Sequence, residues 1–307
     1  MRIGVVIDSA CDLPADYIKQ QGILVLPINL YLGDEHLLDV RDPAATIEFY
    51  EHYAKNRKQT ASTAPPETEQ IIESLLEHAN QFDRLLIVTV TSTRSKVFEH
   101  ASKSQLPLLN ALIQQRRQEN IGGSVLLRVH DSKTMFTGQG VLVHEMVKLL
   151  EQEDLDFNEL CRRADEFSEH IHAYLIPNDL FYVRERARQK GENSVSWLSY
   201  QAGTLLNIKP VIHMHQGDSG ALATARGFDA ALEKLLEIAT DAIDAGLKSN
   251  TVVMSYAGDP KVMGENRLIR EFRAYAASKG VDVLESVMST TAGLNVGPGA
   301  ISLAYAS

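Results

Sequence analysis

The chain has 307 residues, more than the roughly 100–200 residues of a usual single domain, so two domains are expected. Its 30 basic and 40 acidic side chains give a formal net charge of −10, which disfavours nucleic acid and anionic membranes because their phosphates would be repelled. Two cysteines in so long a chain fit a reducing compartment, and no stretch approaches the roughly 20 apolar residues that cross a bilayer. We therefore expect a cytoplasmic protein with no stable membrane insertion.

The first half of the chain alternates short β-branched runs with helical patterns, which is typical of a parallel α/β sheet. Strands are expected over residues 3–8, 23–32, 85–91 and 125–130. Helices are expected over residues 13–22, 43–56, 67–81 and 136–151, and a long helix is expected after the strand at 85–91, ending at about residue 119. The pattern predicts an N-terminal Rossmann-like domain with a mostly parallel sheet.

The second half has a looser pattern with a hairpin in it. Helices are expected over residues 157–167, 179–190 and 261–279. Strands are expected over 170–176, 209–215, 221–226, 251–256 and 281–287. Residues 198–206 are expected to lead into the strand at 209–215, and the end of the chain is expected to be an irregular tail. The turn at residues 216–220 has hairpin chemistry. A hairpin combined with crossovers predicts a C-terminal α/β domain with a mixed sheet. The predicted domains are residues 1–160 and 161–307, with a ligand between them.

Hydroxyl side chains follow three strands of the predicted parallel sheet, and a fourth group precedes a helix. The segments are Asp8-Ser9, Thr91-Ser92-Thr93, Asp131-Ser132 and Thr60-Ala61-Ser62-Thr63. The carboxyl ends of parallel strands meet at the ligand crevice, where free N–H groups and helix dipoles favour an anion. Ser, Thr and Asp are also favoured helix caps, so any one of these loops is more readily explained as a cap. When several such loops lie at adjacent strand ends, an anion site becomes as well supported as helix capping.

The sequence lacks the motifs of several other kinds of site. A P-loop, a G-x-G-x-x-G after the first strand and a nucleophile elbow are absent. His213 and His215 would share one face of a strand, but two histidines do not make a zinc site, and neither H-E-x-x-H nor C-x-x-C occurs. We therefore expect no metal and no cofactor. Asp8 stays a candidate general base, although an aspartate in this position more often caps the turn that follows.

A carboxylate held by neutral hydroxyls and backbone N–H groups fits the remaining pattern. Such a head group orients a ligand whose affinity comes mainly from its apolar part. Burying an acyl chain of about fifteen methylenes contributes up to about 12 kcal/mol, at about 0.8 kcal/mol each. An acidic lipid is therefore the expected ligand.

Six segments, in order and covering nearly the whole chain, resemble motifs of the DegV family of fatty-acid-binding proteins. They are Asp8-Ser9-Ala10-Cys11-Asp12-Leu13-Pro14, Ala61-Ser62-Thr63-Ala64-Pro65, Ser92-Thr93-Arg94-Ser95-Lys96-Val97-Phe98, Asp131-Ser132, Leu205-Leu206-Asn207-Ile208-Lys209-Pro210 with Arg226-Gly227, and Gly297-Pro298-Gly299-Ala300. No single segment is specific, but six in the same order are.

The resemblance implies a fatty acid between the two domains, with its carboxylate met by hydroxyls at Ser62 and Ser95. It also implies a contact from a residue shortly before G-P-G-A, usually histidine. Here this residue is Asn295, whose amide donates a hydrogen bond but carries no charge. The other ligand-binding residues implied by these motifs are Thr63, Ser92, Arg94 and Gly297. The residues expected to shape the crevice without touching the ligand are Asp8, Ser9, Asp131 and Ser132.

The chain departs from the family pattern in two places. Arg94 and Lys96 replace a leucine and a glycine of the second serine loop, where they either strengthen carboxylate binding or point to solvent. In Tyr182–Gln189, Arg188 stands at the arginine of the family's Y-L-x-x-G-G-R-I segment, but both glycines are lost. Arg188 is therefore a candidate partner-docking residue for a partner whose identity is in doubt.

The resemblance implies a carrier without enzymatic activity, which presents the carboxylate of its lipid to a fatty acid kinase. Two alternatives stay open. One is a transferase or kinase-related enzyme that acts on a small phosphorylated or keto substrate with Asp8 as base, and the other is a ligand sensor that acts through domain closure.

Overall fold

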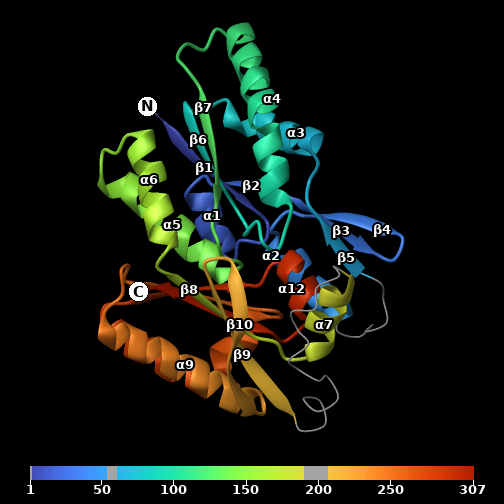
Figure 1. Cartoon of the computed structure of the whole chain (residues 1–307), viewed down its shortest axis with the longest axis vertical. Coiled ribbons are helices and arrows are strands. Elements are labelled where there is room, and N and C mark those ends of the chain that lie inside the picture. Colours follow the sequence, from blue (N-terminus) through green and yellow to red (C-terminus); the bar gives the residue numbers. More distant parts are fainter. Residues whose placement is uncertain (1, 54–60, 190–206) are drawn as a thin grey trace.

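A computed structural model describes residues 2–53, 61–189 and 207–307 (Figure 1). Its N-terminal part contains a four-stranded parallel sheet in the order β2-β1-β6-β7. The strands are β1 (Ile3–Asp8), β2 (Leu24–Leu26), β6 (Arg84–Thr89) and β7 (Leu126–Asp131). Three strands whose ends carry hydroxyls, β1, β6 and β7, are therefore neighbours, as the sequence predicts.

Helices cover both faces of this sheet because its strands are apolar on both sides. On one face, α3 (Thr68–Ala79) and α4 (Val97–Gln118) pack against Val6 and Ile87. On the other face, α1 (Ala15–Gln20), α5 (Thr137–Gln152) and α6 (Phe157–Ser168) share a core with Ile7 and Val88. Neighbouring residues of a strand thus belong to opposite cores, which is typical of the doubly covered parallel sheet of a Rossmann-like domain.

The second sheet is mixed and has six strands in the order β10-β9-β8-β13-β11-β12. They are β8 (Ile171–Ile176), β9 (Ile208–His215), β10 (Asp218–Arg226), β11 (Thr251–Tyr256), β12 (Asp282–Val287) and β13 (Ile301–Ala306). Among its described strands, only β11 and β12 pair in parallel. The helices packed on its outer face are α9 (Phe228–Ala245), α10 (Pro260–Glu265) and α11 (Arg267–Ser278).

Helix α5 lies between the two sheets and contacts both. A Cβ at Gly138 would meet the Ala173 Cβ at 3.0 Å, and a Cβ at Gly140 would meet the Asp12 carbonyl oxygen at 2.9 Å. Both glycines therefore allow the helix to approach its neighbours closely, and Gly138-Gln139-Gly140 is a packing feature rather than a phosphate loop.

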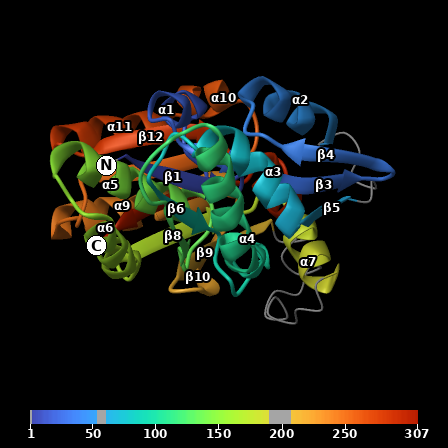
Figure 2. The same ribbon diagram turned by 90° about the horizontal axis from the view of Figure 1, so that it is seen from above.

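A smaller three-stranded antiparallel sheet, β4-β3-β5, lies beside these layers. Its strands are β3 (Ile28–Leu32), β4 (Glu35–Asp39) and β5 (Ala61–Ala64). The helices near it are α2 (Pro43–Tyr53), α7 (Leu180–Gln189) and α12 (Thr290–Val296). Figure 2 shows β3, β4, α2 and α7 at the same end of the molecule.

The two-domain α/β fold is confirmed, with some differences from the expected elements. The expected strand over 23–32 is broken at Pro27 into β2 and β3, since proline cannot donate to a sheet. The expectation of an irregular tail is wrong, because the C-terminal segment contains α12 and the buried strand β13. Residues 198–206 lie outside the described part of the chain. Helix α6 packs on β7 and α5, so we propose a domain boundary after it, near residues 169–170, instead of at 160.

Candidate ligand-binding site

A cavity of about 510 Å³ lies between the carboxyl ends of the parallel sheet and the inner face of the mixed sheet. Residues that follow β1, β6 and β7 form one side of it, and β8, β9, α7 and α12 form the other. Its volume falls in the range of about 300–1,000 Å³ that is usual for sites of small organic ligands. The apolar side chains that line it are Ala10, Ile28, Val90, Met135, Phe136, Leu175, Val183, Ile212, Met214 and Val296.

The mixed sheet turns an apolar face to this cavity. Ile212 and Met214 both line it from β9, and Leu175 pairs with Ile212 across the sheet. The intervening His213 pairs with Tyr174 and therefore points to the opposite face, where their rings stack at 4.8 Å. The histidines of β9 thus do not contribute to the cavity, and its wall suits an acyl chain.

The loop after β6 forms the polar end of the cavity. Ser92, Thr93, Arg94, Ser95 and Lys96 all line it. The Ser95 hydroxyl oxygen accepts a hydrogen bond from the Val97 backbone N–H at 3.4 Å. Because a serine hydroxyl both donates and accepts, its hydrogen is available to a ligand oxygen. Ser92, Arg94 and Ser95 thus line one cavity, and their contact with a ligand stays a prediction.

The tip of the β9–β10 hairpin lies on this loop and joins the two domains. The Thr93 hydroxyl donates to the Gly217 carbonyl at 2.6 Å, and the Gly217 N–H donates to the Lys133 carbonyl at 2.6 Å. The Arg94 Nη2 donates to the Ser219 hydroxyl at 2.7 Å. These contacts fix the loop after β6 against the mixed sheet at the polar end.

Strand β5 brings Thr63, rather than Ser62, to the cavity. Thr63 lines it, whereas Ser62 is exposed and is not a lining residue. Successive side chains of a strand point to opposite faces, so the two hydroxyls cannot both face the ligand. The expectation that Ser62 contacts the head group is therefore corrected, and Thr63, also named from the sequence, occupies that position.

Two other expected site residues have different roles. A Cβ at Gly297 would meet the Tyr182 ring at 2.3 Å, and Gly297 has φ +88°, so it permits a close approach of α12 to α7 and does not line the cavity. Arg188 also lies outside the lining. Its side chain is exposed and pairs with Glu185 at 2.7 Å on the same helix. A surface position suits the docking role expected of Arg188.

Asp8 is fully buried and does not line the cavity. One carboxylate oxygen accepts from the Ala10 N–H at 3.0 Å, and the other accepts from the Val90 N–H at 2.6 Å. Burial raises the pKa of Asp8 to about 6, although these two backbone hydrogen bonds act in the opposite direction. The carboxylate therefore fixes the ends of β1 and β6 and does not reach a ligand as a base.

The remaining crevice residues also form internal hydrogen bonds. The Ser9 hydroxyl oxygen accepts from the Ile28 N–H at 3.1 Å, and the Ser132 hydroxyl donates to the Thr134 carbonyl at 3.2 Å. Asp131 accepts from the Ser92 N–H at 3.2 Å and so holds the loop after β6. None of these three residues lines the cavity, and the role of shaping the crevice stays a prediction for them.

Helix α12 places Asn295 at the cavity. The Asn295 amide donates one hydrogen bond to the Thr291 carbonyl at 2.7 Å. A primary amide has a second N–H, which can be donated to a ligand. Thr291 also lines the cavity, but its hydroxyl donates to Asp39 at 2.7 Å and therefore cannot donate to a ligand at the same time.

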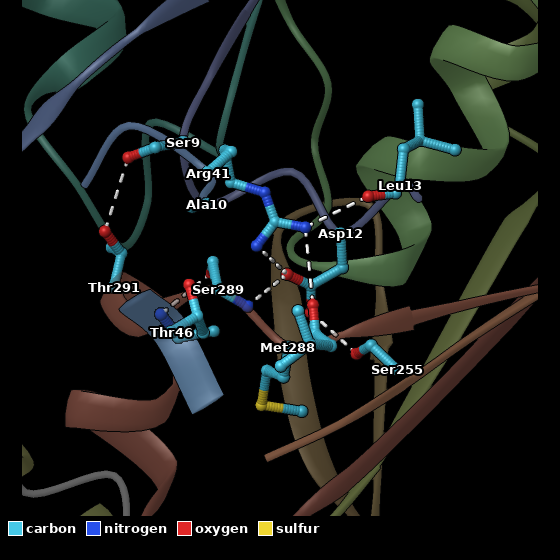
Figure 3. Close-up of polar contacts among 12 residues, drawn as sticks. Ser9, Ala10, Asp12, Leu13, Arg41, Thr46, Ser255, Met288, Ser289 and Thr291 are labelled. Atoms are coloured by element: carbon cyan, nitrogen blue, oxygen red, sulfur yellow. Dashed lines mark hydrogen bonds and ion pairs between the residues drawn. The ribbon is translucent and has the colours of Figure 1, made fainter. Parts of the chain in front are cut away.

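A buried polar network supports the start of α12 (Figure 3). Asp12 accepts from the Ser289 N–H at 2.8 Å and from the Ser255 hydroxyl at 2.6 Å. The Arg41 Nη2 donates to the Leu13 carbonyl at 3.0 Å, and its Nη1 lies 3.7 Å from the Asp12 carboxylate. Burial raises the pKa of Asp12, and the Arg41 charge partly offsets that rise. The network joins the N-terminal domain to the segment that carries the site.

Arg186 lines the cavity and is a site residue that the sequence did not reveal. It is only 8 % exposed, its Nε donates to the Leu294 carbonyl at 2.9 Å, and its Nη1 donates to the Ala61 carbonyl. Arg186 stands where the family segment Y-L-x-x-G-G-R-I has its first glycine. That replacement was the one signal in the sequence that could have identified it.

Neither a metal-binding cluster nor a membrane-spanning helix is found among the described residues. Among them, no three His, Cys, Asp or Glu side chains are grouped so that they could hold a metal ion. No helix in the same part of the chain is long and apolar enough to span a membrane.

A family model described as "Uncharacterised protein, DegV family" matches residues 2–307. The chain belongs to the DegV family. A DegV domain-containing protein of Xanthomonas campestris pv. campestris is 35% identical to it, and the alignment covers 100% of this chain and 98% of the relative.

Solved DegV structures share the fold of this chain. Bacillus subtilis DegV, described as a fatty acid binding protein, has a TM-score of 0.77 and 18% identity, with coverage of 100% of this chain and 99% of that one. The Streptococcus pneumoniae Fatty Acid Kinase (Fak) B3 protein loaded with linoleic acid has a TM-score of 0.72 and 18% identity, again with 100% and 99% coverage. At these identities the comparisons show the two-domain α/β fold alone.

Proposed function

We propose that this protein is a fatty-acid carrier that holds one acyl chain in the cavity between its two domains. The observation that carries the proposal is the cavity's division into an apolar wall and a polar end. Ile212, Met214 and Leu175 form part of the wall, while Ser95 and Thr63 bring hydroxyls to the other end. An acyl chain gains about 0.8 kcal/mol for each buried methylene, so the wall provides affinity and the polar end provides orientation.

The carboxylate is received by neutral donors together with charged side chains. Ser95 and Thr63 supply hydroxyls, and Asn295 supplies an amide N–H. Arg94, Lys96 and Arg186 add positive charge to the same cavity. Charge-assisted hydrogen bonds to a carboxylate are stronger than neutral ones, so these cations favour the ionised form of the acid.

The protein acts without chemistry of its own under this proposal. An enzyme that used Asp8 as base would need its carboxylate at the ligand. Asp8 is instead buried, lies outside the cavity lining and accepts backbone hydrogen bonds at both oxygens. This geometry disfavours the transferase alternative.

The carrier presents the bound carboxylate to an acyl-processing partner, with a fatty acid kinase as the candidate. Support comes from the shared fold of the fatty acid kinase B3 protein and from the exposed position of Arg188 near the cavity-lining residues of α7. The family's two glycines before this arginine are replaced by Arg186 and Ala187, which are both buried, so Arg188 is the one of these three residues that a partner can reach.

Mass spectrometry of lipid extracted from gently purified protein tests the proposal. We expect a long-chain fatty acid at about one molecule per chain. Recovery of no lipid, together with no binding of added oleate or palmitate, would contradict it.

A further inference from the structure

Helix α12 belongs to the C-terminal domain by its place in the chain, between β12 and β13 of the mixed sheet. It nevertheless packs against α2 and β5 of the N-terminal domain as well as against α7. The two hydroxyl donors proposed for the head group, Ser95 and Thr63, both lie on the N-terminal domain. Asn295 of α12 can join them at one carboxylate only if its helix is held against that domain.

Buried side chains of the N-terminal domain hold the backbone at the start of α12. They are Asp12, Asp39, Arg41 and Tyr50. Asp12 accepts from the Ser289 N–H at 2.8 Å (Figure 3), and Asp39 accepts from the Thr291 N–H at 2.8 Å. Because the partners are backbone groups, these contacts fix the path of the chain and not only the position of one side chain.

Tyr50 reaches the same segment from α2. Its hydroxyl oxygen lies 2.9 Å from the Ser289 carbonyl oxygen and 3.0 Å from the Met288 carbonyl oxygen, and its proton is donated to this pair. A Cβ at Gly293 would meet the Tyr50 hydroxyl oxygen at 2.0 Å, so glycine at this position lets the phenol lie directly against α12. Tyr50 is buried and does not line the cavity, so it can affect a ligand only through the helix.

The segment that Tyr50 holds leads directly to Asn295. The Ser289 carbonyl accepts from Tyr50, and the Ser289 hydroxyl caps the first turn of α12. One turn further along, the Asn295 amide donates to the Thr291 carbonyl at 2.7 Å, which fixes the direction of its second N–H. The place of that N–H at the cavity therefore depends on where the first turn of α12 is held.

We propose that Tyr50 is a positioning residue, which sets the affinity for the head group through α12 and Asn295 without touching the ligand. The proposal rests on the proposed function, because it assigns the second Asn295 N–H to the carboxylate. A hydrogen bond weakens steeply away from its preferred distance and angle, so a small displacement of α12 is enough to weaken this one. Tyr50→Phe removes the hydroxyl and keeps the ring packed against Gly293.

A double-mutant cycle tests the proposal by titration of the delipidated full-length protein with oleate. Tyr50→Phe and Asn295→Ala should each weaken binding about two- to ten-fold. The double variant should bind as Asn295→Ala alone does, because Tyr50 acts only through Asn295. A general structural role of Tyr50 would instead weaken binding by the same factor in both backgrounds. That result, or unchanged affinity in either single variant, would overturn the inference.

Tyr17→Phe is the matched control, because it removes another hydrogen-bonded tyrosine hydroxyl of the N-terminal domain. The Tyr17 hydroxyl lies 2.9 Å from the His144 Nδ1, between α1 and α5, and Tyr17 does not line the cavity. This variant should bind oleate as the wild type does, and a loss equal to that of Tyr50→Phe would overturn the inference. No oleate binding by the wild type would instead overturn the proposed function itself.

Discussion

The hydroxyl oxygen of Thr291 lies 2.7 Å from Oδ2 of Asp39, and the backbone N–H of Thr291 donates to the same oxygen at 2.8 Å. Both residues are buried. Asp39 ends β4 and Thr291 is in the first turn of α12, so the pair fixes the helix that brings Asn295 to the cavity. The position of a site residue thus depends on a hydrogen bond between segments about 250 residues apart.

Replacing Thr291 with valine should lower the free energy of unfolding by about 1–3 kcal/mol, because the buried Asp39 carboxylate loses one of its donors. Chemical denaturation measures the change. The control Thr224→Val alters an exposed threonine of β10 and should change stability by less than about 0.5 kcal/mol. Equal effects of the two substitutions would show that the Thr291–Asp39 contact contributes nothing to the free energy of unfolding.

Ser95→Ala should weaken oleate binding about two- to ten-fold, because it removes a hydroxyl donor worth about 0.5–1.5 kcal/mol at the polar end. Ser62→Ala is the matched control, since Ser62 is exposed and does not line the cavity. Calorimetric titration of both delipidated variants gives the comparison. A loss of affinity in Ser62→Ala, with none in Ser95→Ala, would restore the assignment made from the sequence.

Gly297→Ala should destabilise the protein by more than about 2 kcal/mol. A non-glycine residue at φ +88° is strained, and the added Cβ would lie 2.3 Å from the Tyr182 ring. Gly122→Ala serves as control, because a Cβ there meets no heavy atom within 4 Å. The melting temperature of Gly297→Ala should lie clearly below that of Gly122→Ala. Similar melting temperatures would mean that α7 moves to accommodate the added Cβ without a loss of stability.

The histidines on the outer face of the mixed sheet predict a loss of stability in acid. Burial, reinforced by His215, His213 and His170, lowers the pKa of His172 from 6.5 to about 4. The unfolded chain therefore binds more protons than the folded one between these values, and the free energy of unfolding falls as the pH drops from 6.5 to 4.

His172→Phe keeps the ring packed on His215, whose centroid lies 4.3 Å away, and removes the titration. The variant should lose less stability than the wild type over the same pH window, as measured by denaturant unfolding at each pH. The raised pKa of Asp8 acts in the opposite direction in both proteins, so it cancels from their difference. Parallel stability curves would exclude His172 as the source.

The strand ends that build the site could be predicted from the sequence because their pattern is local. Asp8, Thr91 and Asp131 follow apolar β-branched runs, and parallel pairing then places their loops together. Strand β13 could not be predicted in this way. Its alanines and Ser302 give a weak strand pattern, and the buried Ser302 hydroxyl forms hydrogen bonds with Tyr174 and Thr137, which are far away in the chain.

The side chains of the site also differ in whether a local sequence pattern could predict them. Whether Ser62 or Thr63 faces the cavity depends on the register of β5 against β3, and a shift of one residue exchanges the two faces. Arg186 lies at the site because α7 packs against α12 and β5, and no local sequence pattern indicates that packing. Sequence patterns therefore identified the loops around the cavity more successfully than the side chains that line it.

Titration of the delipidated protein with oleate tests the central claim most directly. The wild type should bind one oleate per chain, and Ile212→Asp should abolish binding while the protein stays folded, because it buries a charge in the acyl wall. The control Leu222→Asp changes an exposed leucine outside the cavity and should bind as the wild type does. No oleate binding by the wild type, or undiminished binding by folded Ile212→Asp, would contradict a fatty-acid carrier that uses this cavity.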